Sequence, residues 1–257
     1  FGDGVTVVGA SYTGDARSSG IYSDGDAVSP ELTPGDTGVI LSTGRAGDVT
    51  NSGPGGGPGW GNGQGNGNGI GNGNGFPPWW WGGNSSDPNQ SSATSTNTGG
   101  PNNNPDFNAA AGTNTYDASW LDVDFVPDGD TLTLQFVFAS EEYPEFTSSI
   151  YQDFVGVWVN GQQVDLEVGD GDADPANING TNNQNLFIDN TNDDHNTEMD
   201  GFTVTLTLQM NVVPGELNSV RIGIADVSDS QYDSSLLIAG DSVQGSLIAN
   251  TDTVEIY

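Results

Sequence analysis

The segment TLTLQFVF at residues 131–138 decides the fold class of this chain. Leu132, Leu134 and Phe136 alternate with threonine and glutamine along it, and this two-residue period is typical of a β-strand with one buried face. The same alternation recurs at residues 121–125, 202–210 and 220–224. No segment has a clear helical period. The sequence therefore predicts an all-β fold, an antiparallel β-sandwich or jelly-roll-like domain whose sheets each keep one wet face.

A second pattern predicts a hairpin at residues 153–168. The segment DFVGVWVNG at residues 153–161 is apolar on both faces and ends in Asn160 and Gly161, a pair that favours a two-residue hairpin turn. Alternation then continues to Val168, so we expect the returning strand to pair with the first. Shorter strands are expected at residues 5–10, 39–42 and 236–239.

The composition changes at residues 53–105, which are rich in glycine, asparagine, proline and serine and contain Trp79, Trp80 and Trp81 in succession. We expect one β-sandwich domain over residues 1–257 that carries this stretch as an ordered Gly/Asn-rich insertion. The tryptophans form a large apolar surface. They either fold back onto their own domain or contact another molecule, and the sequence leaves both arrangements open.

Charge excludes several classes of partner. The chain has 35 acidic and three basic residues, a net charge of −32, and no lysine. Nucleic acid and anionic membrane surfaces are excluded, because both are bound through many lysine or arginine side chains. No apolar run approaches the roughly 20 residues of a membrane helix, which argues against membrane insertion. We interpret the chain as a secreted protein that begins at a processed terminus, located outside the cell or on its surface.

Two acidic stretches at the ends of expected strands form the main candidate site. Carboxylates at this density need a counter-charge, and the chain has almost no basic side chains to supply it. Calcium is the natural counter-ion, because it accepts six to eight oxygen ligands in flexible geometry. We therefore predict Ca²⁺ as a cofactor, bound by Glu141, Glu142, Asp153, Asp226, Asp229 and Asp233. The alternative is that these are solvated loop acids.

The sequence also predicts a second, weaker calcium site at Asp170, Asp172 and Asp174. Their spacing matches the first positions of an EF-hand loop, but Pro175 replaces the glycine and Thr181 replaces the final glutamate. Only a partial calcium site is expected there.

An enzymatic role is not expected. The strongest candidate is a glycosidase that would use Glu141 or Glu142 with a second acid. Adjacent residues on a strand point to opposite faces, so these two cannot readily act as a facing pair. We expect that the protein is not an enzyme.

Several motifs resemble those of the choice-of-anchor L domain family. The motifs are FASEEYPEF at residues 138–146, DFVGVWVNG at 153–161, DGFTVTLT at 200–207 and IADVSDSQYDSSLLI at 224–238, with GDGVTVVGASYTGD at 2–15 and GVILSTG at 38–44 upstream. The resemblance implies an exported bacterial β-rich surface protein that is attached through a variable C-terminal signal. The last ten residues contain no apolar helix, basic tail or sortase-type motif, which favours release or self-assembly.

These observations predict a calcium-stabilised, self-assembling structural subunit of an extracellular fibre or biofilm matrix. The alternative is a monomeric calcium-dependent adhesin or carbohydrate-binding module, since exposed aromatic rings stack on glycans. Copies of the chain would join by donation of a terminal strand into the open sheet of the next copy. The residues expected to take part in assembly are Val5, Val7, Trp79, Trp80, Trp81, Val254, Ile256 and Tyr257.

Overall fold

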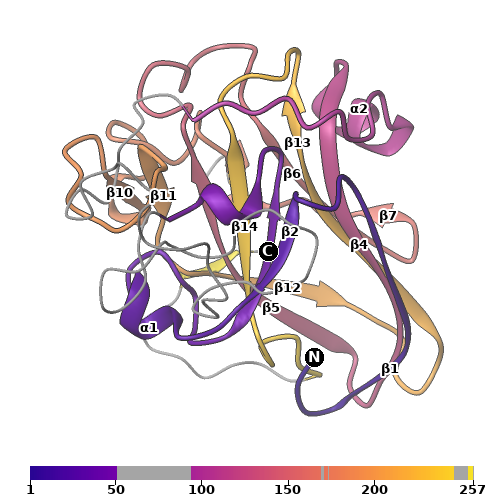
Figure 1. Cartoon of the computed structure of the whole chain (residues 1–257). Helices are drawn as coiled ribbons and strands as arrows, with labels where there is room; N and C mark the ends of the chain where they lie inside the picture. The colour runs from indigo at the N-terminus through magenta and orange to yellow at the C-terminus, as the bar shows by residue number, and fades with distance from the viewer. Residues whose placement is uncertain (51–93, 169–170, 173, 246–253, 257) are drawn as a thin grey trace.

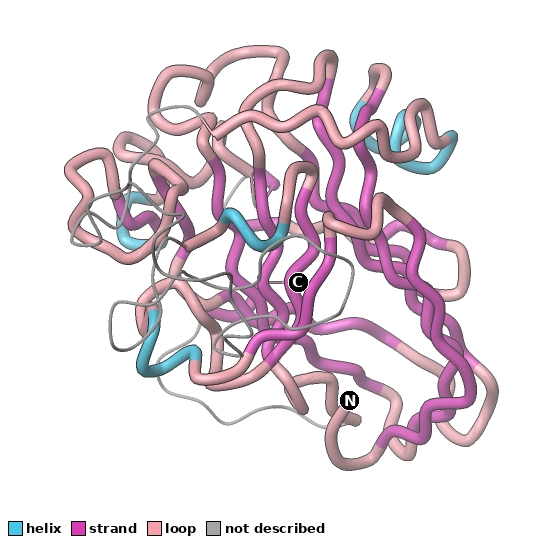
Figure 2. Tube along the Cα trace, viewed as in Figure 1, coloured by secondary structure: helices cyan, strands magenta, loops and turns pink. Residues whose placement is uncertain are grey.

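Strands dominate the computed structural model of the chain, which describes residues 1–50, 94–168, 171–172, 174–245 and 254–256 (Figure 1). They form two large antiparallel sheets (Figure 2) that pack against each other as a sandwich. The predicted all-β sandwich is therefore confirmed. In the parts of the chain just given, no helix is both long and apolar enough to cross a membrane.

The first sheet is built around β4 and β13, the two longest strands of that sheet. In spatial order it contains β1 (Val5–Thr13), β4 (Thr115–Pro127), β13 (Asn218–Val227), β6 (Phe154–Val159) and β7 (Gln162–Gln163). β1 pairs with β4 from Val5 opposite Pro127 to Thr13 opposite Trp120, with a register shift between Val7 and Gly9.

The second sheet is built around β5. In spatial order it contains β10 (Phe187–Asp189), β11 (Gly201–Thr203), β5 (Thr131–Ser140), β14 (Ser234–Ala239), β3 (Gly38–Ser42) and β2 (Ser19–Tyr22). β12 (Leu206–Asn211) pairs with the first half of β5, and β15 (Val254–Ile256) pairs with β12 in parallel. A separate small hairpin joins β8 (Glu167–Val168) to β9 (Gly171–Asp172).

The main core lies between the two sheets, where the alternating residues of the sequence point. Leu132, Leu134, Phe136 and Phe138 of β5 are all at most 3% exposed and belong to this core. They face the inward side chains of the first sheet, among them Val123, Phe125, Val157, Val220 and Ile222. Burial of each such side chain contributes about 1.5–3 kcal/mol, so the core accounts for the pairing of the sheets.

The expectation that each sheet keeps one wet face is wrong over much of the surface. A second apolar cluster covers the outer face of the second sheet beside α1 (Gly25–Val28) and the 3-10 helix η1 (Ala46–Asp48). A third cluster lies on the outer face of the first sheet, beneath α2 (Pro105–Ala111). The reason is visible in β5, where Val137 and Ala139 are as buried as the inward residues.

Two local expectations also need correction. Asn160 and Gly161 do form a tight turn, with φ of 51° and 75°, but the returning strand β7 stops at Gln163 and the next strand pairs elsewhere. The helix α2 was not expected. Its start is nonetheless well specified, because the Asn104 side chain accepts hydrogen bonds from two backbone amides of the first turn and proline follows it directly. A further 3-10 helix, η3, spans Gln184–Leu186.

Most of the expected insertion lies outside the described residues, and so do Trp79, Trp80 and Trp81. Residues 94–104 form a loop that leads into α2. The prediction of an ordered insertion over residues 53–105 is therefore open for residues 53–93.

We predict that Phe107→Ala destabilises the protein by about 3–5 kcal/mol, because Phe107 is fully buried and removal of a buried aromatic ring leaves a cavity. Its ring lies 5.0 Å from that of Trp158 and 5.6 Å from that of Trp120. Urea unfolding monitored by tryptophan fluorescence measures the change. Ile21→Ala is the control, since Ile21 is 63% exposed. Equal stability of the two variants would contradict this assignment of α2 to the core.

Candidate carboxylate site

One end of the sandwich collects the acidic residues that the sequence singles out. Glu141 and Glu142 follow β5, Asp153 precedes β6, Asp226 is in β13, and Asp233 precedes β14. The antiparallel pairing places all of these strand ends at the same end of the molecule. The N-terminal residue packs against Phe125 near the opposite end. Residues separated by more than 80 positions in the sequence are thus brought together.

The five carboxylates are buried. Their exposed fractions are 1% for Glu141, Glu142 and Asp153, 2% for Asp226 and 3% for Asp233. Among the described residues, each has at least one buried oxygen without a hydrogen-bond partner, and Glu141 has two. Buried polar atoms are nearly always hydrogen-bonded. These unpartnered oxygens therefore point to a ligand or to bound protons.

Burial and mutual repulsion raise the pKa values of the group. Burial is the largest cause for Glu142, whose pKa rises to about 10, and the neighbouring carboxylates of Asp153 and Asp229 raise it further. Burial also raises the pKa values of Asp153 and Asp226 well above their usual range, and each carboxylate affects the other. The pKa of Asp233 rises to about 6, mainly through burial.

Glu141 has different neighbours from Glu142. Burial raises the pKa of Glu141 to about 8, and the acids that raise it further are Asp200 and Glu198, not Asp153 or Asp229. Both glutamates lie in the turn that follows β5, and each is close to a different set of acids. The sequence predicted one site for both, and the structure supports two neighbouring groups of acids.

A frame of hydroxyl groups connects the strand ends around the acids. The Ser234 amide donates to the Thr43 hydroxyl at 3.0 Å, and the Ser234 and Ser140 hydroxyls lie 2.8 Å apart. The Ser140 hydroxyl in turn accepts from the Glu142 amide at 2.9 Å. These contacts hold the ends of β3, β5 and β14 together and add hydroxyl oxygens close to the carboxylates.

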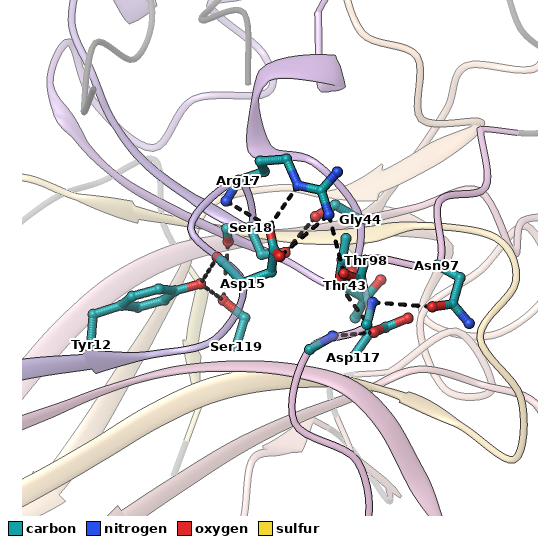
Figure 3. A network of polar contacts seen from close by, with 12 residues as sticks. Tyr12, Asp15, Arg17, Ser18, Thr43, Gly44, Asn97, Thr98, Asp117 and Ser119 are labelled. Carbon is teal, nitrogen blue, oxygen red and sulfur yellow. Dashed lines mark hydrogen bonds and ion pairs between the residues drawn. The ribbon is translucent and has the colours of Figure 1, made fainter. Parts of the chain in front are cut away.

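Asp117 is a member of this region that sequence analysis missed. It is 1% exposed, and its Oδ1 accepts from the Thr98 hydroxyl at 3.1 Å and the Gly100 amide at 2.8 Å (Figure 3). Its Oδ2 is buried and has no partner within the described part of the chain, and its charge raises the pKa values of Asp226 and Asp233. In the sequence Asp117 is one acid among many, so no local signal marks it.

Residues 94–100, which we call the strap, lie across the site. The Thr96 amide donates to Oδ1 of Asp233 at 2.6 Å, and the Asp233 amide donates to the Thr94 carbonyl at 2.8 Å. The Tyr232 amide also donates to the Ser95 hydroxyl at 3.1 Å. The strap thereby fixes Asp233 and ties the segment before α2 to the loop between β13 and β14.

The arginines do not neutralise the buried acids. Arg17 pairs with Asp15 at 2.7 Å and donates to the Thr98 carbonyl (Figure 3), while Arg221 pairs with Asp106 and Asp122. Across the described ranges, no ion pair joins an arginine or the histidine to any of the five buried carboxylates. Their charge must be balanced by protons or by an external cation.

The donor set suits a hard divalent cation, because it consists entirely of oxygen atoms. Within the described residues, no three acidic or histidine side chains converge closely enough to enclose one ion. The acids nevertheless affect one another, since Asp226 and Asp233 both act on the pKa of Asp153. A bound calcium ion would therefore complete its shell with hydroxyl, carbonyl or water oxygens, which calcium accepts.

Of the other predicted site residues, Asp229 lies near the buried acids, since its carboxylate raises the pKa of Glu142. Asp229 is partly exposed, and its Oδ1 accepts from the Gln231 amide. In the weaker second site, Asp170 lies outside the described residues, Asp172 is in β9, and Oδ1 of Asp174 accepts from the Asn177 amide at 3.0 Å.

The residues proposed for assembly are also in separate places. Val5 and Val7 lie in β1, and Val254 and Ile256 lie in β15. Tyr257, like the three tryptophans, lies outside the described residues. Both terminal strands are thus paired within the chain's own sheets, and their role in assembly stays a prediction.

Comparisons with known proteins give one family and little else. The sequence model of the family described as the Choice-of-anchor L domain matches residues 82–244. A comparison with curated proteins gives no match. Among solved structures, the chain is similar to β-glucosidase from Kluyveromyces marxianus in complex with glucose, with 13% identity and a TM-score of 0.21. That match covers 49% of this chain and 11% of the glucosidase, and it carries no argument about fold or function.

We predict that the metal-free protein becomes less stable as the pH rises from about 5 to about 9. Because the folded-state pKa values of Asp233, Glu141 and Glu142 are raised, the folded state binds more protons than the unfolded state in this window. The stability that these protons contribute to the folded state is fully present below the pKa values of the unfolded chain. It is lost as the pH rises through about 6 for Asp233 and then about 8 for Glu141. Thermal unfolding in the presence of a chelator measures this. A melting temperature that rises with pH over the same window would contradict it.

Proposed function

Because the chain belongs to the choice-of-anchor L domain family, we propose that it is a calcium-stabilised structural subunit of an extracellular fibre or biofilm matrix. Family membership makes it a cell-surface or extracellular protein. Calcium binding, self-association and fibre formation are what we propose beyond family membership.

The observation that carries the calcium proposal is the burial of five carboxylates with unpartnered oxygens and no basic partner. Isolated buried charges are very unfavourable, so such groups either take up protons or bind a cation. Calcium is abundant in many extracellular settings, and sites with a Kd of about 10⁻⁴ to 10⁻³ M are common in extracellular modules.

Calcium would link elements that are distant in the sequence. Asp153 lies at the start of β6, Asp226 near the end of β13 and Asp233 at the start of β14. An ion bound between any two of them therefore joins two strand ends. The ion supplies positive charge, and the chain supplies carboxylate and hydroxyl oxygens from the frame of Thr43, Ser140 and Ser234. Binding would then stabilise the folded protein by mass action.

In this proposal the acids are ligands and not catalytic groups. A catalytic carboxyl must contact a substrate, but Glu142, Asp153 and Asp226 are each at most 2% exposed. The protein is therefore proposed to act by binding calcium and other copies of itself, and not as an enzyme.

Self-association would also depend on cations. A net charge of −32 opposes the approach of two copies, and bound calcium lowers that charge. Strand edges at both sides of each sheet then offer backbone hydrogen-bonding groups for contact with another copy.

We predict that calcium raises the melting temperature of the metal-free protein at pH 8. With a Kd of about 10⁻⁴ M, 10 mM calcium corresponds to about 2.7 kcal/mol of stabilisation, or a shift of roughly 5–10 °C for a domain of this size. Differential scanning calorimetry measures the shift. Asp226→Asn should reduce the shift by more than half and should stabilise the chelated protein, because a buried charge is removed.

Asp128→Asn is the matched control, because it removes the same charge from an exposed position. It should keep the full calcium shift. Sodium chloride at the same ionic strength separates calcium binding from general screening. If Asp226→Asn and Asp128→Asn respond equally to calcium, the buried carboxylates are not the binding site.

We also predict that the purified protein forms polymers when calcium is added and returns to smaller species when calcium is chelated. Negative-stain electron microscopy and sedimentation velocity measure this directly. Monodisperse monomers at high protein and calcium concentrations would count against a structural subunit and would favour a monomeric adhesin.

A further inference from the structure

The strand β1 forms a long open edge of the first sheet. It spans nine residues and pairs with β4 along one side, and in the strand order of that sheet nothing in the described chain lies beyond it. Figure 1 shows β1 following β4 along the outer side of the molecule. An open edge of this length presents backbone N–H and C=O groups that can pair with another strand.

β1 has a β-bulge but lacks the charged side chains and prolines that commonly protect an edge. Between Asp3 and Asp15 the sequence contains no charged residue, although natural edge strands are commonly protected by charge. The register shift makes Val8 the extra residue of a bulge, and its side chain is 61% exposed, while Val7 is 43% exposed. The edge strand β1 therefore exposes apolar side chains, whereas a strand that remains unpaired at a sheet edge usually exposes polar ones.

The remaining edges of the two large sheets are much shorter. Within the described residues they are β7 with two residues, β10 and β15 with three each and β2 with four. Short edges are one of the ways in which proteins avoid unwanted pairing. β1 is therefore the edge best suited to a specific contact.

We propose that β1 pairs with β1 of a second copy of this chain in antiparallel orientation, so that the first sheets of two molecules form one continuous sheet. The charge distribution is compatible with a second copy as the occupant, because β1 itself carries no charge and pairing through it places no two acids directly opposite each other, while Asp122 and Asp124 of β4 lie one strand away. Antiparallel pairing of identical strands is self-complementary about a two-fold axis. The exposed Val7 and Val8 would be covered by the partner strand.

This inference deepens the proposed function, since it rests on self-association and names the contact. It also changes the expected role of the N-terminal strand. Val5 and Val7 belong to a strand that is already paired from end to end with β4, so β1 would add to a neighbouring sheet edge to edge, with no need to leave its own sheet.

The absence of cysteine in the chain permits a clean test by cross-linking. Val7→Cys, Gly9→Cys and Ser11→Cys are prepared singly and oxidised mildly in calcium. We expect a disulfide-linked dimer from the cysteine nearest the two-fold axis, because that residue faces its own copy at about 4.5–5.5 Å between Cα atoms, a separation that a disulfide spans. Ile21→Cys on the edge of β2 should remain unlinked. Circular dichroism confirms that each variant is folded.

A second pair of variants tests the contact without a cross-link. Val8→Asp places like charges near one another in the paired strands and should weaken association about fivefold or more, whereas the neutral, β-branched Val8→Thr should associate as the wild type does. Sedimentation velocity gives the dissociation constants.

The outcomes separate this inference from the proposed function. If polymers form in calcium while no β1 cysteine cross-links and Val8→Asp associates normally, pairing through β1 is wrong and self-assembly stands. If the wild type remains monomeric at all concentrations tested, both are overturned. A calcium-dependent rise in melting temperature in that same sample would show that calcium binding alone survives.

Discussion

The burial of several carboxylates without a basic partner is the constraint that governs this structure. Removing a charged carboxylate from water is strongly unfavourable unless it is paired, protonated or bound to a cation. Here Asp153 and Asp226 come from different strands and still lie close enough for each to affect the pKa of the other. Folding therefore brings these groups together, and their negative charge must be balanced by protons or by a cation.

The free energy gained by burying the apolar core offsets the cost of burying these carboxylates. Inward residues from both sheets form one large cluster, and two smaller clusters cover parts of the outer faces. Each strand that contributes a buried acid also contributes side chains to these clusters, for example Ile224 beside Asp226 in β13. The hydrophobic packing of β5, β6, β13 and β14 thus opposes the repulsion at their ends.

The strap and the edge strand β1 are two further features that depend on the two sheets. The strap hydrogen-bonds to Asp233 and to Asp117, so the balance of charge in the site affects a segment that is not part of either sheet. β1 lies on the first sheet and carries no charge. The buried acids and the uncharged strand β1 are therefore separate features of the same sandwich.

The amino-acid sequence by itself determined the fold class and most of the strands. Side chains of a strand alternate between its faces whatever the surroundings, so the pattern at Leu132, Leu134 and Phe136 is readable without a partner sheet. It also identified Glu142, Asp153, Asp226 and Asp233, because acids gathered at strand ends stand out locally. Only the tertiary structure decided that Asp117 joins them, that Glu141 faces other acids, and that α2 covers the first sheet. Those facts depend on which strand ends and faces meet across long sequence separations, and no local pattern encodes such contacts.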